Sequence, residues 1–136
     1  MLLQPKKLKY KKFQKSRCIK KENSVTSIKF GNFAIKAIDF GYISAAQLES
    51  ARIAINRVVK RSGKIWLRVF PNKPITKKPS GVRMGKGKGN VDHWVCCVGS
   101  GRILFELGGV KPNLAKNALK YASSKLSIKT TIIGVY

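Results

Sequence analysis

The stretch from Pro71 to Asn90, PNKPITKKPSGVRMGKGKGN, constrains the fold more than any other part of the sequence. It holds three prolines, four glycines, five lysines and one arginine, and it contains no acidic residue. A helix cannot continue through prolines and glycines at this density, and a central strand would lose too many hydrogen-bond donors. The sequence therefore predicts an irregular loop over 71–90, between two apolar runs. Loops of this length are usually functional or disordered, and cations spaced by glycine suit a phosphate-rich surface.

The net charge favours a polyanion as partner. The chain of 136 residues has 29 Lys plus Arg against 5 Asp plus Glu, which gives a formal net charge of +24. Such a surplus favours nucleic acid. A membrane partner is not expected, because the charge lies along the whole chain instead of on one amphipathic helix, and no apolar run is long enough to span a bilayer. The length and a hydrophobic content of 43% fit one domain with a real core.

The first 24 residues form a basic arm ahead of a single domain over 25–136. Nine basic residues lie between Lys6 and Lys21, interleaved with Tyr10 and Phe13, and no apolar face repeats. The arm is either a solvated, disordered tail or an RNA-binding segment whose cations meet phosphates and whose rings stack on bases. The basic character of the remaining chain favours RNA. The arm residues expected to contact RNA are Lys6, Lys7, Lys9, Tyr10, Lys11, Lys12, Lys15 and Arg17.

Two helices are predicted from apolar spacing. Ser44 and Gln47 form a capping box that opens a helix over 44–61, and Gly63 is the expected terminator. Pro112 opens the second helix at its first turn. The buried ridge predicted for this second helix is Leu114, Ala115, Ala118, Leu119, Ala122 and Leu126.

The strands fill the intervals between these helices. Two are expected within 25–43, around a turn at Gly31-Asn32 and with their aromatic side chains in the core, and others over 64–70, 93–99, 102–108 and 128–136. The segments 93–99 and 102–108 predict a hairpin closed by the turn 99–101. The order β-β-α-β-loop-β-β-α-β predicts an α+β fold, with a mixed sheet packed against two helices.

The cations of the first predicted helix allow two interpretations. Arg57, Lys60 and Arg61 lie near its carboxyl end, where the helix dipole favours positive charge in solvent. Together with Arg52, they also form an edge of the helix that is suited to contact RNA phosphates. The net charge of the chain favours the second interpretation.

No catalytic or metal site is predicted. The five acidic residues are scattered without a pair, and His93 and Cys96 point to opposite faces of a strand, so that they cannot share a metal ion. Three cysteines, two of them adjacent, make a poor disulfide framework, which favours a reducing compartment and small core roles for Cys96 and Cys97.

The glycine-rich stretch does not match a mononucleotide site. The segment 85–90, GKGKGN, lacks the third glycine of a dinucleotide fingerprint, contains no Gly-Lys-Ser or Gly-Lys-Thr, and precedes a β-type run instead of a helix. We therefore expect a prong that contacts a polynucleotide backbone, with no cofactor.

Several stretches resemble one family nearly end to end. They are LLQPKKLKYKKFQK, FGNFAIKA, QLESARIAINRVVKRSGKIWLRVFP, KPITKKPSGVRMGKGKGN, ILFELGGV and KLSIKTT. The most specific pieces are KIWLRVFP and VRMGKGKGN. On these residues the chain resembles the bacterial-type large-ribosomal-subunit protein sixteen. The match departs from the usual pattern at Cys96-Cys97 and around Asp39-Phe40.

The resemblance implies a fold, a role and partners. The fold would be α/β hammerhead-like, and the chain a structural, non-enzymatic constituent of the large ribosomal subunit. Its partners would be large-subunit rRNA, the tRNA in the aminoacyl site near the peptidyl-transferase centre, and neighbouring large-subunit proteins. Beyond the arm, the rRNA-binding residues would be Lys60, Arg61, Lys73, Lys77, Lys78, Arg83, Lys86 and Lys88. The tRNA-proximal residues would be Arg52, Arg57, Arg83, Met84, Gly85 and Lys86.

Two further expectations concern the source and the competing function. The arm matches the mature start of the family, which leaves little room for a cleaved transit peptide. A drift toward Lys, Ile and Asn, which have AT-rich codons, favours an organelle ribosome, in the mitochondrial matrix before the plastid, with the bacterial cytoplasm as the alternative. The competing function is a free-standing basic RNA-binding regulatory protein.

Overall fold

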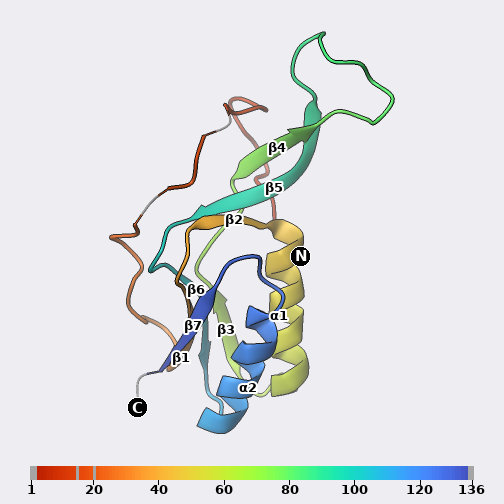
Figure 1. The fold of residues 1–136 in the computed structure, drawn as a ribbon. Helices are drawn as coiled ribbons and strands as arrows, with labels where there is room; N and C mark the ends of the chain where they lie inside the picture. Colours follow the sequence, from red (N-terminus) through yellow and green to blue (C-terminus); the bar gives the residue numbers. More distant parts are fainter. Residues whose placement is uncertain (1–2, 15, 20, 135–136) are drawn as a thin grey trace.

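The computed structural model describes residues 3–14, 16–19 and 21–134, and it shows an α+β fold as predicted (Figure 1). Two helices and seven strands follow one another along the described chain. They are β1 (Phe33–Ala37), β2 (Gly41–Ser44), α1 (Ala45–Val59), β3 (Lys64–Leu67), β4 (Lys73–Lys77), β5 (Asn90–Val98), β6 (Ile103–Gly108), α2 (Pro112–Ser123) and β7 (Thr130–Gly134).

The strands form two separate sheets. The larger sheet has the order β3-β6-β1-β7 and the smaller one the order β2-β5-β4, and every pairing within them is antiparallel. The prediction of one mixed sheet is therefore wrong. The parallel contact found among the described residues is an isolated bridge between Lys21 and Ser100. The hammerhead-like shape implied by the family resemblance stays a prediction.

The core lies between the two helices and one face of the larger sheet (Figure 1). The capping box is confirmed: the Ser44 amide donates to Gln47 Oε1 at 2.9 Å, and the Gln47 amide donates to Ser44 Oγ at 3.2 Å. The predicted ridge of α2 is buried, apart from Leu114, which is exposed, and Leu126, which lies past the helix end and packs partly buried against the core. The buried helix residues are Leu48, Ala51, Ile55, Val59, Ala115, Ala118, Leu119 and Ala122.

The end of α1 differs from its prediction. The left-handed residues are Lys60, with φ of 51°, and Arg61, with φ of 64°, so Gly63 is not the terminator. Gly63 is required for a different reason. A Cβ atom there would lie 2.2 Å from Cγ2 of Val110 and 2.9 Å from the carbonyl oxygen of Gly108, so only glycine lets the chain pass this close to the end of β6.

The hairpin predicted for 93–99 and 102–108 does not form. β5 pairs with β2 and β4, whereas β6 lies in the larger sheet between β1 and β3. The glycine-containing segment between them instead carries the chain from one sheet to the other, with Gly101 at φ of 91°. Every residue of β6 is buried, so its partners are chosen by the core and not by the local turn.

The segment before β1 is also reassigned. Residues 25–32 form no strand, and β1 and β2 lie in different sheets. Gly31 is not a hairpin turn: a Cβ atom there would lie 2.7 Å from the carbonyl oxygen of Leu107, so glycine permits close approach to β6. The core role expected for the aromatics holds for Phe33, which is 5% exposed, but not for Phe30 at 52% or Phe40 at 50%.

A buried carboxylate joins this segment to the larger sheet. Glu106 in β6 is fully buried, and its Oε2 accepts hydrogen bonds from the backbone amides of Lys29 at 3.2 Å, Phe30 at 2.6 Å and Gly31 at 3.0 Å. Its Oε1 accepts from the guanidinium of Arg68. Burial by itself raises the pKa of Glu106, but the amides of Phe30 and Gly31, then Arg68 and the Lys29 amide, outweigh burial, so the pKa lies below its ordinary value.

Replacement of Glu106 is expected to destabilise the free chain strongly. Glu106→Gln leaves Arg68 without its charged partner. It also places a side-chain NH2 group, which is a donor, among backbone amides that are themselves donors. Loss of one partner of a buried ion pair costs about 3–5 kcal/mol. The free energy of unfolding from urea titration measures this loss. Glu49→Gln is the matched control, because Glu49 pairs with Arg52 on the surface of α1, and exposed pairs contribute about 1 kcal/mol or less. Equal losses in the two variants would contradict the role given to Glu106.

The same carboxylate makes stability depend on pH. Because its pKa is lowered in the folded state, its contribution is fully present above the ordinary carboxyl pKa of about 4.3 and is lost as pH falls through the native value. We expect the free energy of unfolding to fall more steeply from about pH 5 to pH 3 in the original chain than in Glu106→Gln. Parallel curves would show that another group dominates the acid response.

Candidate nucleic-acid interface

The basic loop stands on a two-stranded ribbon. β4 occupies Lys73–Lys77 and pairs with β5, so the prediction of an irregular loop over all of 71–90 is wrong for its first third. Pro74 is compatible with a strand here because β4 is the edge of its sheet, where a missing donor can face away from the ladder. The loop that remains, residues 78–89, projects from the end of the ribbon far from the helices (Figure 1).

The tip of this loop is exposed to solvent. Residues 79–88 are exposed, and Met84 is the extreme case at 94%. Gly85, Lys86 and Gly87 all have positive φ, at 107°, 53° and 80°, and no atom lies within 4 Å of the position of a Cβ on either glycine. Lys78 Nζ donates to the carbonyl oxygen of Gly85. Residues 81–87 are therefore held by backbone geometry and one lysine contact, and all of them are exposed.

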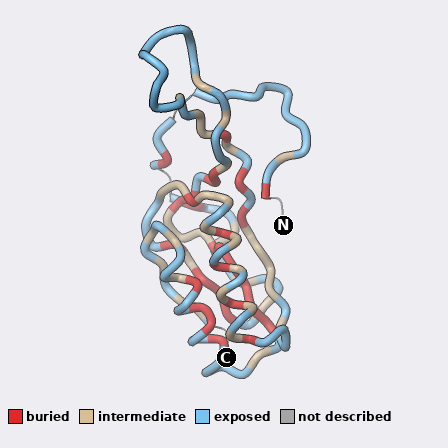
Figure 2. Tube along the Cα trace, turned by 90° about the vertical axis from the view of Figure 1, so that its right-hand side faces the viewer, coloured by how far each residue is buried: buried red, intermediate tan, exposed pale blue. Residues whose placement is uncertain are grey.

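The basic arm lies beside the ribbon instead of extending freely. It forms no helix or strand over its described residues up to Ile19, as predicted. Lys12 Nζ donates to the carbonyl oxygen of Lys88 at 2.9 Å, and Lys88 Nζ donates to that of Phe13. Lys73 Nζ donates to Ser16 Oγ at 2.7 Å. Figure 2 shows arm and loop together as the most exposed part of the molecule.

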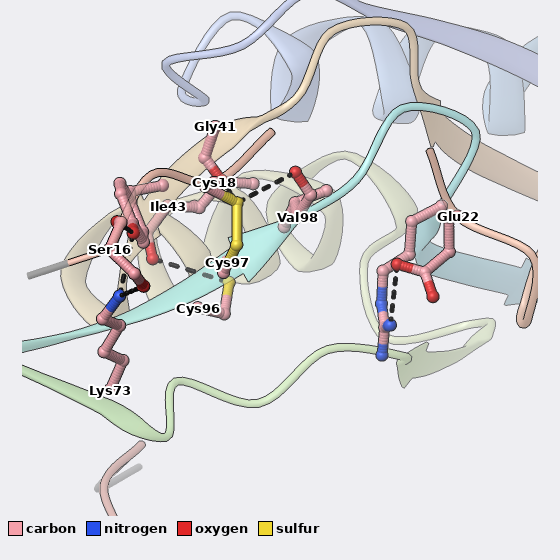
Figure 3. Close-up of a disulfide and its surroundings, with 11 residues drawn as sticks. Ser16, Cys18, Glu22, Gly41, Ile43, Lys73, Cys96, Cys97 and Val98 are labelled. Atoms are coloured by element: carbon pink, nitrogen blue, oxygen red, sulfur yellow. Dashed lines mark hydrogen bonds and ion pairs between the residues drawn. A yellow bond between two sulfur atoms is a disulfide. The ribbon is translucent and has the colours of Figure 1, made fainter. Parts of the chain in front are cut away.

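A disulfide fixes the arm to the ribbon. Cys18 of the arm is bonded to Cys97 of β5, with Cα atoms 5.8 Å apart, and the buried Cys18 sulfur packs against the carbonyl oxygens of Gly41 and Val98 (Figure 3). The prediction of reduced cysteines is thus wrong for two of the three, and Cys97 is exposed instead of buried in the core. Cys96 does lie in the core, where burial raises the pKa of its thiol to about 11.

The structure brings some predicted contact residues together and separates others. The arm carries Lys6, Lys7, Lys9, Tyr10, Lys11, Lys12 and Arg17, the ribbon and loop carry Lys73, Lys77, Lys78, Arg83, Lys86 and Lys88, and α1 with its C-terminal end carries Arg52, Arg57, Lys60 and Arg61. The first two groups share one end of the molecule. Lys15 lies outside the described residues.

The cations of α1 form a second site. An open groove of about 660 Å³ is lined by Arg57, Lys60, Arg61, Ile53 and Asn56. These residues belong to the C-terminal part of α1 and the residues after it, and this end of the helix is remote from the loop (Figure 1). The tRNA-proximal set is therefore not one patch, because Arg57 lies on this groove and Arg83 to Lys86 lie at the loop tip. Arg52 is already engaged, since Glu49 Oε1 lies 2.6 Å from its Nη2 and holds the pKa of Arg52 above its ordinary value.

One cluster was missed by the sequence analysis. Phe30 stacks on Trp66 of β3 with ring centroids 6.1 Å apart, and Lys29, Lys64 and Arg68 lie over these rings. The signal was present in the strand predicted over 64–70, where Trp66 and Arg68 alternate with Ile65 and Leu67, which pack partly buried against the core. Phe30 was expected in the core together with the other aromatics of 25–43.

Most of the acidic residues are paired with cations. Three of the five pair with a cation, Glu22 with Arg102, Glu49 with Arg52 and Glu106 with Arg68, and Asp92 Oδ2 lies 2.8 Å from Nδ1 of His93. Within the described part of the chain, no group of three His, Cys, Asp or Glu side chains could hold a metal ion. No helix in that part is both long and apolar enough to cross a bilayer. The fold and its surfaces define a basic α+β protein suited to bind a polyanion through an arm, a loop and a helix groove.

The comparisons with known proteins place the chain in one family. The model of the family "Ribosomal protein L16p/L10e" matches residues 5–133. Proteins called "Large ribosomal subunit protein uL16" are similar over nearly the full length. That of Blochmanniella pennsylvanica is 56% identical over 98% of this chain and 99% of its own length, and that of Kosmotoga olearia is 52% identical over 99% and 96%. The chain therefore belongs to the ribosomal protein L16p/L10e family, in its bacterial-type branch, and is a structural protein and not an enzyme.

Removal of the disulfide is expected to loosen the arm and lower stability. The bond closes a loop with a sequence separation of 79, and release of a loop of this size costs about 2–4 kcal/mol. Urea unfolding of the original chain with and without a thiol reductant measures the loss. Cys18→Ser should match the reduced chain and should not respond to the reductant. A response of equal size in both proteins would assign the effect to something other than the Cys18–Cys97 bond.

Proposed function

We propose that this chain is a structural constituent of the large ribosomal subunit that clamps rRNA with its arm and its loop. The observation that carries the proposal is the joining of these two basic segments on one ribbon, by the disulfide and by the contacts between Lys12, Phe13 and Lys88. Two cationic segments held at a fixed separation suit the crevice where two RNA helices meet. The relatives named above are called large-subunit proteins, which supports the same role for this chain.

The physical basis of the clamp is neutralisation of phosphates. Each lysine or arginine that contacts a phosphate releases condensed counterions, so affinity falls as salt rises. The described cations of the arm and the loop cations other than Lys78 are exposed, and the loop contains no acidic residue that would compete with rRNA for them. Tyr10, at 66% exposed, and Phe13, at 48%, add rings that can stack on unpaired bases beside these cations.

The loop tip is the part proposed to approach the aminoacyl-tRNA site and the peptidyl-transferase region. Arg83 is the residue suited to a specific contact, because its guanidinium can fork onto a phosphate or stack on a base. Gly85 and Gly87 allow the backbone to come close to RNA, and Lys86 between them adds charge. On α1, Arg57 is the better candidate for a tRNA contact, since Arg52 is already paired with Glu49.

The proposed compartment is inferred from the organisms of the relatives. They are bacterial proteins and support a bacterial-type ribosome in the cytoplasm, whereas the mitochondrial matrix, favoured by the drift toward Lys, Ile and Asn, has no support among them. Neighbouring large-subunit proteins are proposed as further partners. The competing function, a free-standing basic RNA-binding regulatory protein, is not favoured by any observation on the described residues.

Binding to purified large-subunit rRNA tests the clamp. We expect the chain to sediment with this rRNA at physiological salt, and absence of binding would overturn the proposal. Lys86→Ala should weaken binding and reduce the slope of log K against log salt by about 1, the value for one lost phosphate contact. Lys125→Ala, which removes an exposed lysine next to α2, should leave the slope unchanged. Equal slopes for both variants would remove Lys86 from the interface.

Arg83→Ala tests the approach of the loop tip to the tRNA site. Because the arm, the ribbon and the α1 groove keep their cations, we expect the variant to enter large subunits almost normally and to slow accommodation of aminoacyl-tRNA. Quantitative mass spectrometry of purified subunits measures the first quantity, and rapid kinetics with labelled tRNA measures the second. Parallel loss of assembly and accommodation would limit Arg83 to a structural contact.

A further inference from the structure

We infer that Phe30 and Trp66 form a platform on which one unpaired base of the large-subunit rRNA stacks. The platform lies where Glu106 of the larger sheet meets Phe30 and Arg68, and it shares no residue with the arm, the loop or the lining of the α1 groove. The inference rests on the proposed function, since it takes large-subunit rRNA as the partner.

The first observation is an exposed aromatic side chain in an ordered setting. Phe30 is 52% exposed although its backbone amide is bound to the buried Glu106 of β6. Its ring stacks on that of Trp66, with ring centroids 6.1 Å apart and an interplanar angle of 20°.

The second observation is that the ring is held in place before any partner binds. The amide of Phe30 donates to the buried Glu106 at 2.6 Å, and the amides of Lys29 and Gly31 donate to the same oxygen atom. Arg68, fixed by Glu106, lies 4.9 Å from the centroid of the Phe30 ring. A ring fixed in this way loses little conformational freedom on stacking, which favours binding.

The third observation is the charge around the rings. Lys29 Nζ lies 5.9 Å from the Phe30 ring centroid, and Lys64 Nζ lies 5.4 Å from that of Trp66. Glu106, the acidic residue beside the rings, is fully buried and paired, so it presents no free charge to an incoming phosphate. Aromatic rings bordered by cations are the arrangement with which proteins bind unstacked bases and their flanking phosphates.

The competing explanation is that the rings only shield Glu106 and its amide donors from water. The two explanations differ in what the exposed face of Phe30 contacts in the ribosome. They therefore differ in the behaviour of a variant that keeps an apolar cover and removes the aromatic ring.

The experiment compares rRNA reactivity in purified large subunits that contain the original chain, Phe30→Leu or Phe30→Trp. Base-resolved chemical probing of the rRNA is the measurement, and thermal unfolding of each free chain reports on folding. Phe30→Leu keeps an apolar cover but no aromatic face. We expect one or two unpaired nucleotides to gain about fivefold or more in reactivity, the lower limit for loss of one base–aromatic stack. Phe30→Trp should keep the protection.

Tyr121→Ala is the matched control, because Tyr121 is an aromatic residue on α2 that is 61% exposed. It should leave the nucleotides protected by Phe30 unchanged. An unchanged reactivity map with Phe30→Leu present in the subunits at normal occupancy would overturn the platform and favour the shielding role. Failure of the original chain to enter large subunits would instead contradict the proposed function, so the two failures are distinguishable.

Discussion

The buried carboxylate of Glu106 is the interaction on which the arrangement of the larger sheet and its cover depends. A charge in the interior is tolerated only where hydrogen bonds and an opposite charge replace the lost water. Three successive amides and Arg68 supply them here. Glu106 in this way fixes residues 29–31 against β6 and holds Arg68 after β3. The chain has few acidic residues, and because Glu106 is buried, its negative charge is not presented at the basic surface.

The outer end of the molecule is organised by a second constraint, which is covalent. The basic arm and the smaller sheet would repel each other, since both carry many cations. The Cys18–Cys97 bond and the hydrogen bonds of Lys12, Lys73 and Lys88 to oxygen atoms hold them side by side. The exposed loop projects from this end of the molecule (Figure 1).

Local chemistry explains which parts of the fold could be predicted. The capping box of Ser44 and Gln47 and the proline that opens α2 act within one turn of helix, so their effects are readable from neighbouring residues. Strand partners are not local. β5 and β6 looked like a hairpin because three turn-forming residues separate them, but burial of β6 placed it in the other sheet. The edge position of β4, which makes Pro74 acceptable, likewise depends on the whole sheet.

The sequence by itself determined the basic character of the protein, its two helices, the exposed Gly-Lys tip of the loop and the family resemblance, because each of these rests on residue type and short spacing. The tertiary structure decided that the arm is bonded to β5, that Arg52 is neutralised by Glu49, and that Phe30 faces outward while Phe33 is buried. These outcomes depend on distances between residues far apart in the chain. Cys18 and Cys97, and likewise Phe30 and Trp66, become neighbours only when the sheets have formed.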